Sequence, residues 1–281
     1  LWDYFHPLEK DLSTDVVIVG SGITGALMAH ELCHAGIKCC IVDKRSIATG
    51  SSAASTALLQ YEIDVPLCRM AKIIGEENAA TAYHACLQSI SDIKRVLEET
   101  GVNAGFEQLP SLFYASSAAD NKLLEQEHEI RQKHKLPVNL LEKKKIREEY
   151  KVKTPGNALI NEASAQMDAY RAATGLLAYH IKESGLKVFT HTSIKECIET
   201  SDGCIMTTDR GHKIKCGYVI IATGFEAGQF LPQKIMDLTS TYALVSHPVA
   251  SEHLWPTHCL IWETADPYLY IRTTDKNRII V

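Results

Sequence analysis

The chain has 281 residues, of which 46% are hydrophobic and 22% are charged, and its formal net charge is −5. Such a length suffices for about two domains with a large buried core, which excludes a disordered or disulfide-stapled chain. The mild acidity disfavours a basic nucleic-acid binder, so we predict no nucleic-acid partner.

The first predicted elements form a strand–turn–helix–strand unit. The apolar run 16–19 is typical of a central parallel strand that is buried on both faces. A glycine-rich turn follows at 20–25, then a helical pattern that ends at Gly36, and then a second apolar strand over 39–42. Asp43 ends that strand. This order predicts a Rossmann-like dinucleotide-binding unit, and the alternative is a glycine turn used only for packing.

The spacing of the three glycines carries the chemistry of this turn. Gly20 permits the tight turn, Gly22 lets the backbone approach a pyrophosphate, and Gly25 allows the helix to pack closely on the strand. The helix N-terminus supplies N–H donors and a favourable field for phosphate. Asp43 is placed to accept hydrogen bonds from a ribose, and its charge disfavours the 2′-phosphate of NADP.

The middle of the chain departs from a simple nucleotide fold, because no third strand follows Asp43. Small residues fill 48–56, where a serine-rich helix start suits a second contact with a cofactor and simple helix capping is the alternative. A long helix is predicted over 69–100, with a break near Gly75. Two surface helices are predicted over 120–153, and their run of three lysines is interpreted as a solvated face.

The C-terminal half begins with an amphipathic helix that Asp168 caps and that ends at Gly185. Short strands with turns at 202–203 and 210–211 then predict a β-meander, which ends in a buried strand and a glycine turn at 218–224. Further strands are predicted at 242–246, 260–263, 268–272 and 278–281.

The ordered set of motifs resembles the D-amino-acid oxidase superfamily of FAD-dependent oxidoreductases, which includes glycine oxidase, sarcosine oxidase and glycerol-3-phosphate dehydrogenase. The resemblance rests on the glycine turn with Asp43-Lys44-Arg45, the segment 49–55, the strand and turn 219–224, and the hairpin 268–281. It implies an α/β protein: a Rossmann-like FAD-binding domain with a β-meander, and an α+β substrate domain with an antiparallel sheet. We assign 1–75 and 155–238 to the FAD-binding domain, and 76–154 and 239–281 to the substrate domain.

The cofactor expected from the motifs is noncovalent FAD, since an NAD-binding fold would continue with a third strand after Asp43. No cysteine or histidine spacing indicates a metal site. From the glycine motif and the resemblance together, the expected FAD-binding residues are Gly20, Ser21, Gly22, Ile23, Thr24, Gly25, Asp43, Lys44, Arg45, Ser51, Ser52, Ser55, Thr56, Ala57, Ile194, Ala222, Thr223 and Gly224.

The candidate catalytic residues lie on the predicted strand 268–272. Alternation along that strand puts Tyr268, Tyr270 and Arg272 on one face, where they would form a cradle for a substrate carboxylate. The alternative is an amphipathic strand whose polar face meets solvent. In the glycine-oxidase pattern the anchoring arginine would fall at Thr274 instead, and Tyr242 is a further pocket candidate.

These features predict an enzyme that oxidises the C–N bond of a small amino acid or secondary amine by hydride transfer to FAD, with oxygen or a quinone as electron acceptor. The alternatives are C–O oxidation of a 2-hydroxy acid or polyol phosphate, and a flavin-binding fragment or subunit without turnover. The nine scattered cysteines predict a reduced, cytoplasmic chain whose thiols are mostly buried, and no apolar run is long enough to span a membrane. The apolar run at the end, 278–281, predicts that a final segment is missing.

Overall fold

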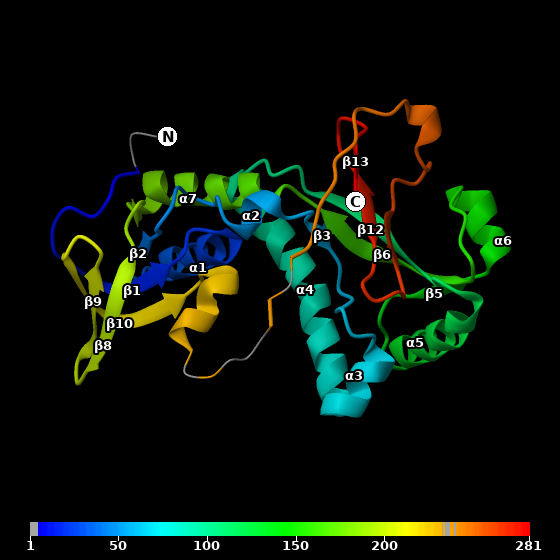
Figure 1. Ribbon diagram of the computed structural model, residues 1–281, viewed down its shortest axis with the longest axis horizontal. Coiled ribbons are helices and arrows are strands. Elements are labelled where there is room, and N and C mark those ends of the chain that lie inside the picture. The colour runs from blue at the N-terminus through cyan, green and yellow to red at the C-terminus, as the bar shows by residue number, and fades with distance from the viewer. Residues whose placement is uncertain (1–4, 232, 234–236, 239) are drawn as a thin grey trace. The chain divides into compact units, whose positions relative to one another are not determined.

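The computed structural model describes residues 5–231, 233, 237–238 and 240–281, which form two compact units (Figure 1). The first unit comprises Leu1–Ser55, Leu97–Ala104 and Asp168–Thr241. The second unit comprises Thr56–Val96, Gly105–Met167 and Tyr242–Val281. Each unit contains one β-sheet, and the two units are described separately below.

The sheet of the first unit has six strands in the order β7-β2-β1-β10-β9-β8. The apolar run predicted as a central strand lies in β1, which pairs in parallel with β2 and β10, and its residues 16–19 are buried. The predicted meander is confirmed, because β8, β9 and β10 pair antiparallel in sequence order. The strand bounds are Leu12–Val19 (β1), Cys39–Val42 (β2), Lys187–Phe189 (β7), Ile194–Thr200 (β8), Gly203–Thr208 (β9) and Lys213–Ile221 (β10).

The helices of the first unit include the two that the sequence pattern predicts. The helix α7 begins after Asp168, whose side chain accepts a hydrogen bond from Arg171 N, and it ends at Gly185 with φ +67°. Helices α1 and α7 pack against each other beside the sheet (Figure 1). The bounds are Ile23–His34 (α1), Ser51–Ala54 (α2), Ala169–Ser184 (α7) and the 3-10 helix Gly224–Phe230.

The strand β10 forms as predicted, but its burial differs from the prediction. Only its residues 213–216 pair with β9, whereas 218–221 pair with β1 alone. Tyr218 is therefore 75% exposed and Ile221 is 37% exposed. An apolar β-branched run indicates a strand, but the neighbouring elements decide whether each face of that strand is covered.

The sheet of the second unit is mixed, which corrects the antiparallel sheet that was predicted. Its order is β13-β12-β11-β4-β6-β3, with β5 also paired to β6. The neighbours β4 and β11 run parallel, because a long connection rather than a hairpin joins them. The strand bounds are Leu58–Leu59 (β3), Glu107–Tyr114 (β4), Asn139–Leu141 (β5), Ala158–Gln166 (β6), Leu260–Glu263 (β11), Tyr270–Thr273 (β12) and Ile279–Ile280 (β13).

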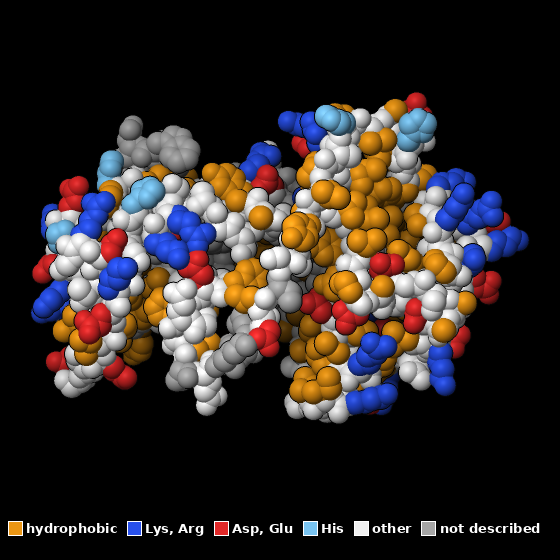
Figure 2. Space-filling model, viewed as in Figure 1, with side chains coloured by type: hydrophobic (Ala, Val, Ile, Leu, Met, Phe, Trp, Pro, Cys, Tyr) orange, Lys and Arg blue, Asp and Glu red, His pale blue; other side chains and the backbone are white. Residues whose placement is uncertain are grey.

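The helices of the middle segment follow the predicted pattern. The long helical region breaks at Gly75, which has φ +86°. The three lysines of α6 are exposed, and basic side chains gather over this helix in Figure 2, as expected for a solvated face. No helix among the described residues is both long and apolar enough to cross a bilayer. The bounds are Leu67–Ile74 (α3), Glu76–Thr100 (α4), Asn121–Lys133 (α5), Lys143–Lys145 (α6), Ala118–Asp120 and Ser251–His253 (both 3-10), and Ile146–Tyr150 (π).

A buried ion network ties α5 to the segment before α3. Arg131 is 0% exposed and donates to Glu127 Oε1 at 2.7 Å and to Glu62 Oε1 at 3.1 Å. Glu127 also accepts from the N–H groups of Leu67 and Cys68 at the start of α3, both at 2.8 Å. Both carboxylates thus lie beside one guanidinium in the interior. Removing one of these charges would leave its partners buried and unpaired, which would destabilise the fold.

Several predicted boundaries differ from the structure. The segments 56–75 and 155–167 belong to the second unit, because β3 and β6 pair with each other within its sheet. The segment 97–104, predicted for the substrate domain, belongs to the first unit. The predicted boundary at 238–239 touches residue 239, which lies outside the described residues. The predicted strand 242–246 forms only an isolated bridge, Val245 to Ile280, so that segment gains too few ladder bonds to be a strand. The strand predicted to start at Tyr268 starts at Tyr270.

Candidate cofactor-binding site

Two glycines of the turn are required by close backbone contacts. Gly20 has φ +111°, and a Cβ there would lie 2.3 Å from Ala222 O. A Cβ at Gly25 would lie 2.0 Å from Gly20 O. Because real side chains never approach so closely, only glycine allows β1, α1 and the end of β10 to meet at this point.

Ser21 and Asp43 lock the glycine loop to the end of β2. Asp43 Oδ2 accepts hydrogen bonds from Ser21 N at 2.8 Å and from Ser21 Oγ at 2.5 Å. Asp43 Oδ1 accepts from Arg45 N at 2.9 Å, and Ser21 Oγ accepts from Ala48 N at 3.2 Å. The carboxylate predicted to bind a ribose thus holds the loop, and the second lone pair of Oδ1 is where a ribose hydroxyl would donate.

A serine of the serine-rich segment caps the start of α1. Ser52 Oγ accepts a hydrogen bond from Ile23 N at 2.9 Å, so it satisfies one of the N–H groups that a helix start leaves without an intrahelical partner. A Cβ at Gly22 would lie 3.0 Å from this same oxygen. The capping interpretation therefore holds for Ser52, but the capped helix is α1 and not α2, for which no side-chain cap is found.

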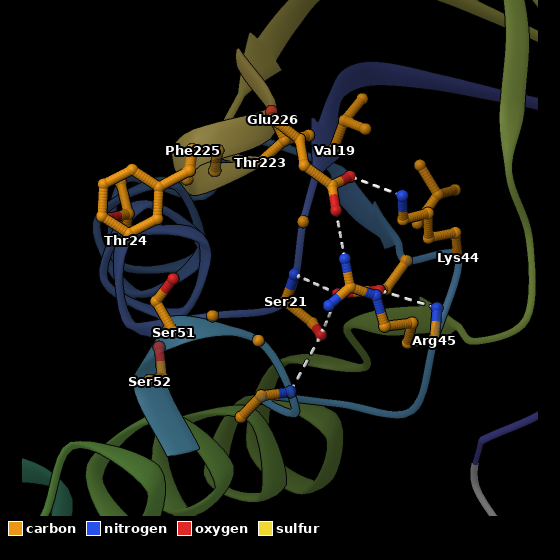
Figure 3. Close-up of a pocket in the computed structure, with 18 of the residues that line it drawn as sticks. Val19, Ser21, Thr24, Lys44, Arg45, Ser51, Ser52, Thr223, Phe225 and Glu226 are labelled. Atoms are coloured by element: carbon orange, nitrogen blue, oxygen red, sulfur yellow. Dashed lines mark hydrogen bonds and ion pairs between the residues drawn. The ribbon is translucent and has the colours of Figure 1, made fainter. Parts of the chain in front are cut away.

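Glu226 reaches across the opening from the 3-10 helix after β10 (Figure 3). Its carboxylate contacts Lys44 Nζ at 2.5 Å and also forms an ion pair with Arg45. The hydrogen bond from Lys44 is the main cause that lowers the pKa of Glu226 from its ordinary value. These ion pairs connect the segment that follows β2 with the segment that follows β10, and all three residues line the pocket described next.

These segments enclose a pocket of about 410 Å³, a size typical of small-molecule sites. Gly25 lies outside the lining because it packs against Gly20, and Thr56 and Ala57 belong to the second unit. The predicted residues that line the pocket are Gly20, Ser21, Gly22, Ile23, Thr24, Asp43, Lys44, Arg45, Ser51, Ser52, Ser55, Ile194, Ala222, Thr223 and Gly224.

Sequence reasoning missed part of the lining. Most of the missed residues adjoin the recognised motifs, so a window of a few residues on either side would have found them. Glu226, two residues after the glycine turn, carried no motif signal of its own. The missed residues are Val19, Val42, Ala48, Gly50, Thr192, Ser193, Phe225, Glu226, Gln229 and Phe230.

The predicted catalytic side chains lie in the second unit. Arg272 Nη1 donates to Gln166 Oε1 at 3.2 Å, and its Nε donates to Thr56 O. The rings of Tyr268 and Tyr270 lie 5.7 Å apart. Tyr242 is 88% exposed.

Comparisons with known proteins agree with this architecture. The profile of the family described as "FAD dependent oxidoreductase" matches residues 15–281. A curated relative, a putative Rieske 2Fe-2S iron–sulfur protein of Bacillus subtilis, is 23% identical over 221 residues, which are 79% of this chain and 42% of that protein. The chain thus spans less than half the length of that relative.

Two solved structures share the fold. Glycine oxidase from Geobacillus kaustophilus aligns with a TM-score of 0.76 at 20% identity, over 96% of this chain and 70% of that one. L-α-glycerophosphate oxidase from Mycoplasma pneumoniae, solved with FAD bound, aligns with a TM-score of 0.73 at 17% identity, over 96% of this chain and 70% of that one.

The pocket residues suit FAD, the cofactor of this family. The first turn of α1 directs N–H groups and the positive end of its dipole at the pocket, as a pyrophosphate requires. Thr223 Oγ1 is buried in the lining and finds no hydrogen-bond partner among the described residues. A buried hydroxyl without a partner costs free energy, and the polar atoms of a dinucleotide would supply one.

Proposed function

The chain belongs to the FAD-dependent oxidoreductase family, and we propose that it oxidises the C–N bond of a small amino acid or secondary amine. Bound FAD would supply the acceptor for the hydride, which carries two electrons away from the substrate carbon. The protein's task is then to fix the cofactor, to orient the substrate and to stabilise charge. The pocket between β1, β2 and β10 would perform the first task, and we expect FAD to bind there without a covalent link.

The observation that carries the proposal is the placement of Arg272 on β12. Its guanidinium is half-buried, and the backbone carbonyl of Thr56 and the side chain of Gln166 both hold it. A planar guanidinium in a fixed orientation matches a carboxylate through two parallel hydrogen bonds. Arg272 is therefore the residue that we expect to anchor the substrate carboxylate.

The two tyrosines before Arg272 form the aromatic side of this proposed cradle. Tyr268 donates from its hydroxyl to Asp64 Oδ1 at 2.8 Å, and its ring lies 6.2 Å from that of Trp262. Burial and the Asp64 carboxylate raise the pKa of Tyr268, which keeps the phenol neutral. Tyr270 packs against the core cluster that contains Trp262. The proposed role of both rings is to orient the substrate, whereas the exposure of Tyr242 gives it no such support.

A second candidate function is C–O oxidation of a 2-hydroxy acid or a polyol phosphate. The similar structures include both glycine oxidase and L-α-glycerophosphate oxidase, and a guanidinium binds a carboxylate and a phosphate equally well. Either reaction leaves reduced flavin, which oxygen or a quinone would reoxidise.

The nine cysteines are all free thiols, which favours a reducing compartment such as the cytoplasm.

The test is to mix the FAD-loaded protein with candidate substrates without oxygen and to follow the loss of the flavin's visible absorbance. Small amino acids or secondary amines should bleach the flavin. Bleaching only by hydroxy acids or polyol phosphates would reject the C–N proposal in favour of the second candidate. Bound FAD that no substrate of either class bleaches would instead support a flavin-binding subunit without turnover.

Replacing Arg272 by methionine tests the anchor itself. Loss of one or two charge-assisted hydrogen bonds should lower kcat/KM by about 10- to 10⁴-fold, mostly through KM, while FAD binding persists. Arg278→Met is the matched control, because Arg278 donates to Ser246 O on the neighbouring segment and has no proposed substrate contact. Equal kinetic effects of the two substitutions would contradict the assignment of Arg272.

A further inference from the structure

Two cysteine sulfurs meet at the end of α1 that lies away from the pocket. Cys33 lies in the last turn of α1 and Cys39 is the first residue of β2, and the turn 35–38 between them is exposed. Their Sγ atoms are 3.9 Å apart, and both residues are half-buried. The prediction that most of the nine thiols are buried is wrong, because only three of them are. A disulfide between Cys33 and Cys39 would require the distance between their sulfurs to shorten to about 2.05 Å.

A buried histidine pair lies beside Cys33. His180 on α7 is 4% exposed, and its Nε2 lies 3.0 Å from His30 Nδ1 on α1. Its Nδ1 lies 3.0 Å from Ser184 Oγ. The imidazole of His180 and the hydroxyl of Ser184 both act on the Cys33 thiol, and such polar neighbours favour the thiolate.

The two thiols differ in their tendency to ionise. A hydrogen bond from the Cys39 thiol, helped by His180 and Ser184, lowers the pKa of Cys33 to about 5. The same bond and burial raise the pKa of Cys39. We therefore expect Cys33 to ionise first and to react, and Cys39 to be the thiol that resolves it.

We propose that Cys33 and Cys39 form a peroxide-sensitive dithiol that closes to an intramolecular disulfide. The Cys33 thiolate attacks one oxygen of hydrogen peroxide, the O–O bond breaks, and hydroxide leaves while Cys33 becomes a sulfenic acid. The Cys39 sulfur then attacks the Cys33 sulfur, the S–O bond breaks, and water leaves with the thiol proton. In total two thiols and one peroxide give one disulfide and two waters, and the peroxide is the species reduced.

Burial raises the pKa of most of the other thiols. Cys40, Cys216 and Cys259 are buried, and desolvation raises the pKa of each thiol. Burial raises the pKa of Cys86 as well, although this residue is half-buried like the proposed pair. Cys86 is therefore the matched internal control, because its exposure is similar and its sulfur is not activated.

The experiment treats the FAD-loaded protein with hydrogen peroxide, blocks the remaining thiols with an alkylating agent and maps the peptides by mass spectrometry. A disulfide between Cys33 and Cys39, with loss of two hydrogens, should form before Cys86 loses its free thiol. Cys39→Ser should instead leave a sulfenic acid on Cys33 that dimedone traps. Cys33→Ser should abolish both products, and Cys86→Ser should change neither.

Two results would overturn the proposal. One is the loss of the Cys86 thiol as fast as the thiols of Cys33 and Cys39. The other is a wild-type protein in which Cys33 is oxidised to sulfenic or sulfinic acid while Cys39 stays alkylatable. Because the wild-type chain alone decides both points, the outcome does not depend on the folding of a variant. It is also independent of the substrate proposal, since added peroxide is the only oxidant used.

Discussion

Replacing Gly22 by valine should abolish FAD binding while the protein still folds. Gly22 lies between β1 and α1, where its backbone faces the pocket, and a Cβ added there meets only Ser52 Oγ, at 3.0 Å. That oxygen would shift and weaken its hydrogen bond from Ile23 N, at a cost of about 0.5–1.5 kcal/mol. Domain stabilities of about 5–15 kcal/mol tolerate such a loss.

The loss in cofactor affinity should be larger. The valine side chain would separate the pyrophosphate from the N–H groups at the start of α1. Losing two hydrogen bonds to a charged group costs about 1.5–3 kcal/mol each, or roughly 3–6 kcal/mol together. Since each 1.4 kcal/mol is a factor of ten, the Kd for FAD should rise by about 10²- to 10⁴-fold.

The assay is a titration of the cofactor-free protein with FAD, followed by the quenching of flavin fluorescence, with thermal unfolding measured in parallel. Gly228→Val is the matched control, because a Cβ there meets nothing within 4 Å and Gly228 does not line the pocket. If Gly22→Val binds FAD with an unchanged Kd, the pyrophosphate does not lie against this turn. Should valine prevent folding, Gly22→Ala provides the same comparison with a smaller side chain.

Two further predictions concern the buried network in the second unit. Arg131→Met should lower the free energy of unfolding, measured with urea, by about 3–5 kcal/mol, because Glu62 and Glu127 would stay buried without their cation. A loss below about 1 kcal/mol would contradict this prediction. Burial raises the pKa of Glu62 above its ordinary value of 4.5. Protonation of Glu62 therefore stabilises the folded state at low pH, and this stabilisation is lost as the pH rises. Glu62→Gln should remove this pH dependence above pH 4.5, and equal stability–pH slopes in both proteins would refute it.

Local features carried most of what could be predicted for the first unit. The glycine spacing, Gly36 and Asp43 constrain one short continuous segment, in which chain geometry alone dictates strand, turn, helix and strand. The same holds for α7, since Asp168 and Gly185 are capping signals that act within a few residues. Most of the residues that these motifs predict for the cofactor-binding site line the observed pocket.

The tertiary structure decided the features that depend on residues far apart in the chain. The parallel pairing of β4 with β11 joins segments about 150 residues apart, and no local pattern specifies such a partner. Likewise, Glu226 meets Lys44 only because β2 and β10 both pair with β1, one on each side of it. Exposure of Tyr218 and Ile221 depends on what covers β10, not on their apolar character.

The sequence by itself determined the class of the protein, because a phosphate-binding turn needs a local backbone shape that only a few residue types allow. It also predicted most of the residues that line the pocket at that turn. Only the tertiary structure revealed the thiol pair at Cys33 and Cys39, the ion pair of Glu226 and the contacts that orient Arg272. Such contacts depend on how sheets and helices pack, and packing joins side chains that no spacing along the chain relates.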